Sequence, residues 1–305
     1  MKVQLNKDSL HARSLLLPVT KSTRLIMIGC GGTGSWLAPH VVRVARLLQE
    51  ARDQDVSIVF WDHDHVEAKN IFRQNFCEAE IGTNKALALA QRYGHAWDIL
   101  IAAIEKPFDK GIVTRNDFAP SYNDQRTTVF VTCVDNNSAR RAVAKMCQNW
   151  PIWWVDTGNL KTSGQVSVGR NLNNNEPSPL RFPSKTTWLP MPSLQFPEIL
   201  TGKEESRQAD DYSNLSCADL AIVDEQGLSI NHAIASAAAN LLMKMLVTGD
   251  LQYHCVHVST DFGTSLIYNS PRTIRSYFKA QRFKTQKEGH ISDEFVGDET
   301  ADENE

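Results

Sequence analysis

The 305-residue sequence lacks several patterns that would assign it to a specialised class of protein. Its six cysteines form no Cys-x-x-Cys pair, which argues against a four-cysteine zinc site and makes a disulfide framework unnecessary. Lysine and arginine (32) do not outnumber aspartate and glutamate (35), so the charge balance is not that of a general nucleic-acid binder. No apolar run of about 18 residues is present, and the N-terminus lacks the apolar core of a secretory signal. We therefore expect a cytoplasmic globular protein with no membrane span, no direct nucleic-acid binding and no structural zinc.

Apolar runs and helical periodicities alternate along the first half of the chain. We predict strands at residues 24–28, 56–61, 99–104, 128–134 and 152–156, and helices at 35–49, 83–93 and 138–148. This alternation predicts an α/β fold that is Rossmann-like and doubly wound, with a mostly parallel sheet covered on both faces. Further strands at 165–169, 252–259 and 265–268 and a helix at 228–246 predict an antiparallel C-terminal extension.

A glycine-rich turn joins the first predicted strand to the first predicted helix. Its glycines are Gly29, Gly31, Gly32 and Gly34. Glycine lets the backbone approach a phosphate closely, and the free N–H groups at a helix start attract an anion. The same spacing satisfies the Gly-x-Gly-x-x-Gly pattern of NAD-dependent enzymes. The turn therefore predicts a nucleotide site without choosing between ATP and NAD, and a purely structural turn is the alternative.

Asp62 follows the second predicted strand, where a carboxylate can accept hydrogen bonds from both ribose hydroxyls of ATP or NAD. A helix cap or a solvated turn would explain one aspartate equally well. His63, Asp64 and His65 continue the loop. We interpret this alternation of aspartate and histidine as a solvated loop rather than a metal site, because the sequence shows no further ligand cluster nearby.

Four polar residues between positions 70 and 85 favour ATP over NAD. Arg73 can hold phosphate through its planar guanidinium, and Lys85 supplies a mobile point charge. Asn70 and Gln74 can bind phosphate oxygens or a water on Mg²⁺. Each residue alone is as well explained by an ordinary surface position. Their joint arrangement behind a glycine turn indicates a triphosphate site.

Asp135 and Asn136 follow the predicted strand at 128–134. Ligands of open α/β sheets bind at the carboxyl ends of the strands, and a hard carboxylate suits Mg²⁺. We expect Asp135 to bind Mg²⁺ and Asn136 to contact the nucleotide. N-capping of the following helix is the alternative role for this stretch.

Taken in order, these residues resemble a known signature. Gly29-x-Gly31-Gly32-x-Gly34, Asp62-x-Asp64-x-Val66-Glu67-x-x-Asn70-x-x-Arg73-Gln74, Lys85 and Asp135-Asn136-x-x-x-Arg140 are similar to the adenylation motifs of ThiF, MoeB and ubiquitin-activating enzymes. The resemblance spans residues 22–160, roughly half of the chain. The length and the divergent second half most resemble ThiF-related proteins of plasmid-borne PRTRC cassettes.

The resemblance implies a reaction and a set of roles. The C-terminal carboxylate of a ubiquitin-like or sulfur-carrier protein would attack the α-phosphate of ATP, giving an acyl-adenylate and pyrophosphate. Asp62 would bind the ribose, and Asp135 would bind Mg²⁺. The phosphates would be bound by Asn70, Arg73, Gln74 and Lys85; Arg73, Lys85 and Asp135 would be the catalytic residues. A homodimer is also implied, in which the N-terminal segment of the partner supplies one more arginine; Arg13 is the first candidate and Arg24 the second.

Some relatives pass the activated carboxyl to a cysteine as a thioester. Cys217 is the candidate here, because it lies between the irregular segment and the late helix, where the family places its crossover loop. A free thiol near a cationic site can have a lowered pKa. The alternative is an inert cysteine that anchors the end of the loop.

The sequence thus predicts five segments. They are an N-terminal arm at 1–21, an ATP-binding adenylation core at 22–170, an irregular crossover or lid at 171–216, a C-terminal helix and strands at 217–287, and an acidic, disordered tail at 288–305. Two other functions remain open at this point. An NAD-dependent Rossmann oxidoreductase would share the glycine turn and Asp62 but would leave Arg73 and Lys85 unexplained. A non-catalytic nucleotide-binding scaffold in plasmid maintenance would keep the fold without turnover.

Overall fold

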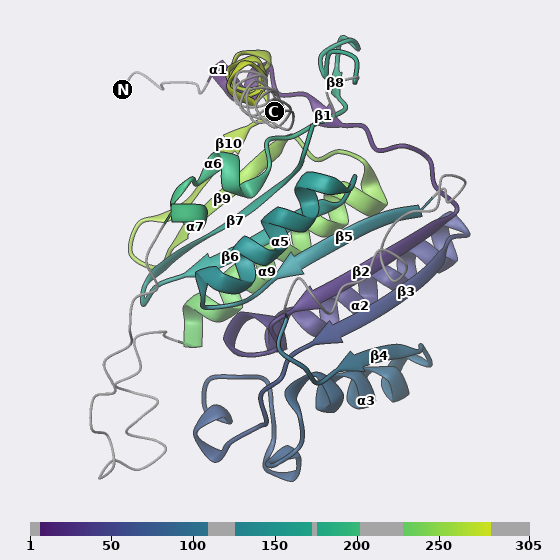
Figure 1. Cartoon of the computed structure of the whole chain (residues 1–305), viewed down its shortest axis with the longest axis vertical. Coiled ribbons are helices and arrows are strands. Elements are labelled where there is room, and N and C mark those ends of the chain that lie inside the picture. Colours follow the sequence, from purple (N-terminus) through teal and green to yellow (C-terminus); the bar gives the residue numbers. More distant parts are fainter. Residues whose placement is uncertain (1–6, 109–125, 173–175, 202–227, 282–305) are drawn as a thin grey trace, which may run out of the picture.

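The computed structural model describes residues 7–108, 126–172, 176–201 and 228–281. Its central element is an eight-stranded sheet with the strand order β10-β9-β7-β6-β5-β2-β3-β4 (Figure 1). Strands β2, β3, β4, β5 and β6 are parallel, and β7, β9 and β10 continue the sheet through antiparallel pairings. The strands are β2 (Ser22–Ile28), β3 (Asp55–Trp61), β4 (Ile101–Ile104), β5 (Arg126–Thr132), β6 (Trp153–Asn159), β7 (Ser163–Arg170), β9 (Tyr253–Ser259) and β10 (Gly263–Tyr268).

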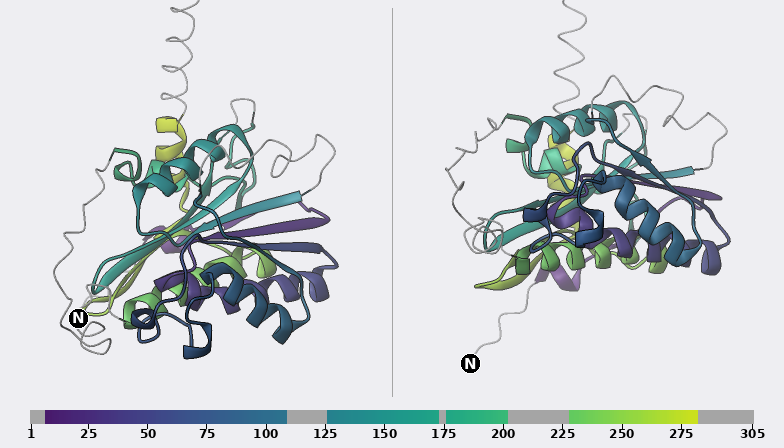
Figure 2. Two further views of the ribbon diagram at one scale, coloured as in Figure 1. Left: turned by 60° about the horizontal axis from the view of Figure 1, so that its bottom comes forward. Right: turned by 90° about the horizontal axis from the view of Figure 1, so that it is seen from below.

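Helices cover both faces of this sheet, as the two turned views of Figure 2 show. One face carries α2 (Gly32–Arg52), α3 (Lys85–Trp97) and α9 (Leu228–Leu242), which continues as the π-helical turn η3 (Met243–Thr248). The other face carries α5 (Asn137–Asn149) and the short helices α6 (Pro192–Gln195) and α7 (Glu198–Thr201). The remaining elements are α1 (Lys7–Leu10), the two-stranded pair β1 (Ser14–Leu15) and β8 (Lys185–Thr186), and the 3-10 turns η1 (Ala68–Asn70) and η2 (Glu78–Glu80); residues 271–281 are helical.

The central strand β2 shows why the sheet needs two helical layers. Leu25 and Met27 are fully buried in the core under α2 and α9, whereas Ile26 and Ile28 are buried in the core under α5. A strand that is apolar on both faces exposes no polar stripe to water, which is the usual state of a parallel strand between helices. The predicted doubly wound, mostly parallel fold with an antiparallel C-terminal extension is confirmed.

The strand order reverses at β2, because the chain continues to β3 on one side and later returns to β5 on the other. Connections on the two sides leave the sheet toward opposite faces, so a crevice opens beyond the carboxyl ends of β2, β3 and β5. The predicted functional residues follow these strand ends directly.

A proline inside α2 fixes the next part of the site. Pro39 has no N–H, so the carbonyl of Ser35 lacks its helical donor. The side-chain amide of Asn75 donates to that carbonyl at 3.2 Å, and the Asn75 backbone N–H donates to the Ser35 hydroxyl at 2.9 Å. These bonds attach the loop that contains Arg73 and Gln74 to the helix that follows the glycine turn.

One helical stretch, Ser229–Thr248, is long and apolar enough to span a membrane by length and composition alone. In the fold it packs as a core helix. Its residues Ile230, Ile234, Ala238 and Leu241 are completely buried against α2 and the sheet.

Two expectations differ in detail from the structure. Strand β5 ends at Thr132, so Cys133 and Val134 belong to the loop beyond it rather than to the strand. The described residues of the segment predicted as irregular, 171–172 and 176–201, contain β8, α6 and α7 and bury Trp188, Leu189 and Met191. Trp188 and Leu189 pack into the core that includes α2 and α9, and Met191 packs into the core under α5, so this part of the segment is held against the main sheet.

Candidate functional site

A cavity of about 430 Å³ lies beyond the carboxyl ends of β2, β3 and β5. Most of the residues singled out in the sequence line it, although they come from loops far apart in the chain. They are Gly29, Gly31, Gly32, Asp62, Asn70, Arg73, Gln74, Lys85, Asp135 and Asn136. Gly34 does not line the cavity.

The glycine turn owes its shape to two close backbone approaches. Gly29 has a φ of +91°, and a Cβ there would lie 2.6 Å from the carbonyl oxygen of Cys133. A Cβ on Gly34 would lie 2.0 Å from the carbonyl oxygen of Gly29. Gly29 therefore brings the ends of β2 and β5 together, and Gly34 allows α2 to start directly against the turn. Gly31 and Gly32 leave bare backbone on the cavity wall.

Asp62 lies at the end of β3 and holds the glycine turn from the side. Its carboxylate accepts the backbone N–H of Cys30 at 2.6 Å and that of Asp64 at 2.9 Å. Burial raises the pKa of the Asp62 carboxyl, although these N–H groups and the nearby Lys85 act in the opposite direction. Each carboxylate oxygen has a second lone pair, so the group can still accept a hydroxyl from the cavity side.

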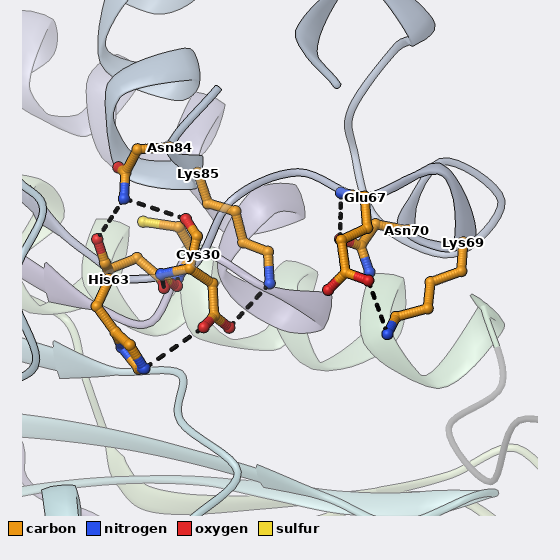
Figure 3. Close-up of polar contacts among 9 residues, drawn as sticks. Cys30, His63, Glu67, Lys69, Asn70, Asn84 and Lys85 are labelled. Carbon is orange, nitrogen blue, oxygen red and sulfur yellow. Dashed lines mark hydrogen bonds and ion pairs between the residues drawn. The ribbon is translucent and has the colours of Figure 1, made fainter. Parts of the chain in front are cut away.

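Lys85 is the first residue of α3, and its ammonium group forms an ion pair with Asp64 at 3.1 Å (Figure 3). The lysine side chain is 8% exposed, whereas the Asp64 side chain is 53% exposed. Burial alone would raise the pKa of Asp64, but Lys85, His63 and His65 outweigh it and the pKa lies below its usual range. An ammonium group has three N–H donors, so Lys85 can keep Asp64 and still donate to a phosphate oxygen.

Asn84 explains why α3 begins at this residue. Its side-chain oxygen accepts the backbone N–H of Leu87 at 3.0 Å, as an N-cap does. Its amide nitrogen donates to the carbonyls of Asp62 and Asp64 at 2.9 and 3.1 Å. One side chain thus joins the helix start to the loop after β3, which places the Lys85 ammonium at the cavity.

The loop from Glu67 to Gln74 forms another part of the cavity wall. The Asn70 side chain accepts the backbone N–H of Glu67 at 2.9 Å, which completes a capping box, and Lys69 forms an ion pair with Glu67 at 2.8 Å (Figure 3). The indole N–H of Trp36 donates to the carbonyl of Arg73 at 3.1 Å. Gln74 is buried, and its side-chain oxygen Oε1 has no partner among the described residues. A buried amide oxygen without a donor is uncommon in folded proteins.

Asp135 and Asn136 have different local roles. The side chain of Asn136 accepts the backbone N–H of Ala139 at 2.9 Å and is the N-cap of α5. Asp135 is exposed on the cavity wall. Because Asn136 supplies the cap, the Asp135 carboxylate is not needed for it. A hard oxygen ligand at this position fits Mg²⁺, which prefers carboxylates and phosphate oxygens.

Arg140 fixes the loop that carries Asp135. Its guanidinium donates to the carbonyls of Val134 at 2.7 Å and Thr157 at 2.9 Å, and to the carboxylate of Asp156 at 3.0 Å. Burial raises the pKa of Asp156, against the effect of Arg140, and the aspartate is 2% exposed. The planar fork therefore holds the ends of β5 and β6 in one arrangement.

The structure adds lining residues that the sequence did not single out, among them Thr33, Lys69, Lys106, Phe108 and Asn159. Among the lining residues, the lysines and arginine are Lys69, Arg73, Lys85 and Lys106, and the carboxylates are Asp62, Asp64, Glu67 and Asp135. The two signs balance, and two of the lysines are paired with carboxylates. The ammonium groups of Lys69 and Lys85 can therefore turn from these carboxylates to an anion in the cavity.

Other predicted residues lie elsewhere. The guanidinium of Arg13 donates to the carbonyls of Leu180 at 3.1 Å and Phe182 at 2.6 Å, so it attaches the N-terminal arm to its own chain. Arg24 lies within β2, four residues before the strand ends, and does not line the cavity. Cys217 lies outside the described residues. Ligand atoms of Asp62, His63 and Asp64 lie within 4.8 Å of one another, but both carboxylates already have the partners described above.

Solved structures with the same architecture include E. coli MccB with ATP, which is 14% identical with a TM-score of 0.54 over 82% of this chain and 65% of that chain. E. coli MccB with AMPCPP and the peptide MccA gives 14% identity and a TM-score of 0.53 over 83% and 66%. MccB, the microcin C7 biosynthetic enzyme, in complex with N-formylated MccA gives 16% identity and 0.52 over 83% and 67%. The chain thus spans about two thirds of the length of these proteins. No curated protein sequence matches it significantly.

A sequence model of the ThiF family matches residues 15–288, which is most of the chain. The match runs from the arm before β2 to beyond β10 and so includes every strand of the large sheet. The chain belongs to the ThiF family.

Proposed function

We propose that this chain binds ATP with Mg²⁺ in the cavity and adenylates the C-terminal carboxylate of a small protein or peptide. One observation carries the proposal: Arg73 and Asp135, from two separate loops, and Lys85, the first residue of α3, line a single cavity beside the glycine turn. A dinucleotide dehydrogenase has no need of this combination, whereas a triphosphate under nucleophilic attack does. The MccB structures with ATP and AMPCPP support the choice of nucleotide.

In the proposed reaction, a carboxylate oxygen of the substrate attacks the α-phosphorus of ATP. The bond from this phosphorus to the bridging oxygen breaks, and pyrophosphate leaves with the electron pair. No protein nucleophile or proton transfer is required for this step. The chain contributes position and charge: Asp62 binds the ribose, and Arg73 and Lys85 neutralise the phosphates together with Asn70 and Gln74.

Asp135 is the residue that we assign to Mg²⁺, with Asn136 beside it as a nucleotide contact and α5 cap. The bound metal would offset the negative charge of the phosphates. Arg140 keeps the Asp135 loop in place through Val134. We therefore expect Asp135→Ala and Arg73→Ala to abolish adenylation in a chain that still folds, because both side chains lie on the wall of the cavity rather than in the core.

The substrate class is proposed from two sources. The sequence signature resembles that of enzymes that activate ubiquitin-like or sulfur-carrier proteins, and MccB has been solved with a peptide, MccA. A small protein or peptide could present its C-terminal carboxylate to the nucleotide. Transfer of the activated carboxyl to Cys217 as a thioester is a separate proposal. It predicts a thiol-sensitive adduct that is lost in Cys217→Ala while adenylation continues.

The test is isotope exchange between pyrophosphate and ATP. Small proteins encoded beside this chain serve as the substrates, each with a free C-terminus and with an amidated C-terminus. Exchange that needs the free carboxylate supports the proposal. ATP binding without exchange for any of them would favour a non-catalytic scaffold, and NADH binding without ATP binding would favour an oxidoreductase.

The proposed assembly is a homodimer formed through a shallow groove between α2 and α9. Trp36, His40, His232, Ala233 and Ser236 are among the residues that line its volume of about 850 Å³. The face is more apolar than polar, and the rings of Trp36 and His232 are in contact, with centroids 3.6 Å apart and planes tilted by 39°. Two copies that cover this face would bury its aromatic and alanine surface.

A further inference from the structure

Asn231, in the first turn of α9, is fully buried behind the wall of the cavity. Its side-chain oxygen accepts two hydrogen bonds, from the hydroxyl of Thr33 at 3.2 Å and from the amide of Asn159 at 2.8 Å. Both donors line the cavity, whereas Asn231 does not. A single amide therefore joins the start of α2 to the end of β6.

Asn231 also supports the glycine turn by direct contact. A Cβ on Gly32 would lie 2.8 Å from Oδ1 of Asn231 and 3.1 Å from its Nδ2. The turn can rest against this amide only because residue 32 has no side chain. Any movement of Asn231 is thus passed to the bare backbone that faces the cavity.

The Nδ2 group of Asn231 has no hydrogen-bond partner among the described residues, although it is buried. A buried donor without a partner is unfavourable for folding. An apolar side chain of similar volume would avoid that cost, but it would leave Thr33 and Asn159 without their acceptor. The amide is therefore better suited to arranging these two residues than to stabilising the core.

The next residue on the helix acts on another part of the site. The ring of His232 contacts that of Trp36, with centroids 3.6 Å apart and planes tilted by 39°, and the indole N–H of Trp36 donates to the carbonyl of Arg73. Consecutive residues at the start of α9 thus support two parts of the cavity wall from behind: Asn231 contacts the glycine turn, and His232 contacts the tryptophan that holds the Arg73 loop.

We propose that Asn231 is a positioning residue that holds the glycine turn and Asn159 at the separation required by the nucleotide phosphates. The inference rests on the proposed function, because it assigns the cavity to a nucleotide. It adds a residue from α9 to a site whose lining residues lie between positions 28 and 159.

The test compares Asn231→Ala with Asn240→Ala. Asn240 lies on the same helix, and its amide donates to the hydroxyl of Tyr253 at 3.1 Å, away from the cavity. Affinity for Mg²⁺ and AMPCPP, an ATP analogue that cannot be cleaved between its α- and β-phosphates, is measured by calorimetry on the full chain. We expect a dissociation constant about tenfold higher for Asn231→Ala, which corresponds to the net contribution of roughly one hydrogen bond. We expect no change for Asn240→Ala.

Two further variants separate positioning from general stability. Asn231→Asp keeps an acceptor for Thr33 and Asn159 but places a carboxyl beside the glycine turn, so we expect folding with weakened binding. In an Asn159→Ala background, Asn231→Ala should change the dissociation constant by clearly less than it does in the natural chain, because the contact to Asn159 is already lost and only those to Thr33 and Gly32 remain. If Asn231 had only a general structural role, Asn231→Ala would raise the dissociation constant by the same factor with and without Asn159→Ala.

The outcomes distinguish the two proposals. If the natural chain fails to bind Mg²⁺ and AMPCPP, the proposed function fails, and the inference fails with it. If the natural chain binds, but folded Asn231→Ala and Asn231→Asp both bind within twofold of it, the inference alone is overturned. An undiminished effect of Asn231→Ala in the Asn159→Ala background would also overturn it.

Discussion

Replacing Lys85 with methionine separates the chemistry of the site from the stability of the fold. Methionine keeps most of the length and apolar volume of the lysine side chain and removes only the ammonium group. The ammonium contacts the carboxylate of Asp64 at 3.1 Å, and the lysine side chain is 8% exposed while its partner is 53% exposed.

The expected effect on folding is small. The ion pair is open to water on the Asp64 side, where pairs contribute on the order of 0.5–1 kcal/mol. The sign follows from the pKa: Asp64 has a lowered pKa in the folded chain, so the pair stabilises the fold above the usual carboxyl pKa and loses this contribution as the pH falls through the lowered value. At pH 7 we therefore expect Lys85→Met to cost about 1 kcal/mol or less.

Lys244→Met is a matched control. Lys244 contacts Asp250 at 2.9 Å, with exposed fractions of 32% and 54%, and neither residue lines the cavity. Its loss should also cost about 1 kcal/mol or less in folding free energy, measured by urea unfolding. The two variants thus differ mainly in whether the lost charge faces the proposed triphosphate.

The expected effect on adenylation is much larger. A unit charge about 4 Å from a phosphate oxygen, at an effective dielectric constant of about 20, contributes roughly 4 kcal/mol. That corresponds to a loss of about two to three orders of magnitude in pyrophosphate exchange. Lys244→Met should retain the natural rate. The reasoning is refuted if Lys85→Met, folded to the same extent as the control, exchanges pyrophosphate within threefold of the natural chain.

Three further outcomes are expected. Gly34→Ala places a Cβ 2.0 Å from the carbonyl of Gly29, so it should lower the free energy of unfolding by about 1–3 kcal/mol and weaken ATP binding; thermal melts that match those of the natural chain would contradict the close contact. His254 is buried, and burial lowers its pKa to about 4. As the pH falls below about 6.5, the imidazole of His254 is protonated in the unfolded chain but not in the folded one, so the free energy of unfolding decreases by about 2 kcal/mol between pH 7.5 and 5. His254→Gln should show a correspondingly smaller decrease in urea titrations. Ser236→Glu introduces a charge into the α2–α9 groove and should shift a dimer to a monomer in sedimentation experiments without altering ATP binding; an unchanged mass would place the interface elsewhere.

The glycine turn and the charged residues near it could be predicted because the chemistry follows strand ends. Gly29, Asp62 and Asp135 each come directly or shortly after a buried apolar run, and the carboxyl ends of parallel strands meet at one edge of a sheet. Local sequence patterns therefore predict one common site for these residues. The position of Lys85 followed less directly, since Asn84 caps the helix and the predicted start at residue 83 was two residues too early.

Other parts of the site left no local pattern. Asn231 contacts Thr33 across 198 positions of sequence, and it is one of two asparagines in an alanine-rich helix, where it has the appearance of an ordinary polar residue. Lys106 shortly after β4 and Asn159 at the end of β6 likewise belong to no recognised motif. Their roles depend on the packing of α9 and on the strand order, which periodicity alone does not specify.

The central claim concerns the place of the triphosphate. A crystal structure of this chain with AMPCPP and Mg²⁺ would test it most directly. The account predicts the α-phosphate against the backbone of Gly31 and Gly32, phosphate oxygens within hydrogen-bonding distance of Arg73 and Lys85, and the metal beside Asp135. A nucleotide bound away from this cavity, or bound in it with Arg73 and Lys85 both directed away from the phosphates, would contradict the account.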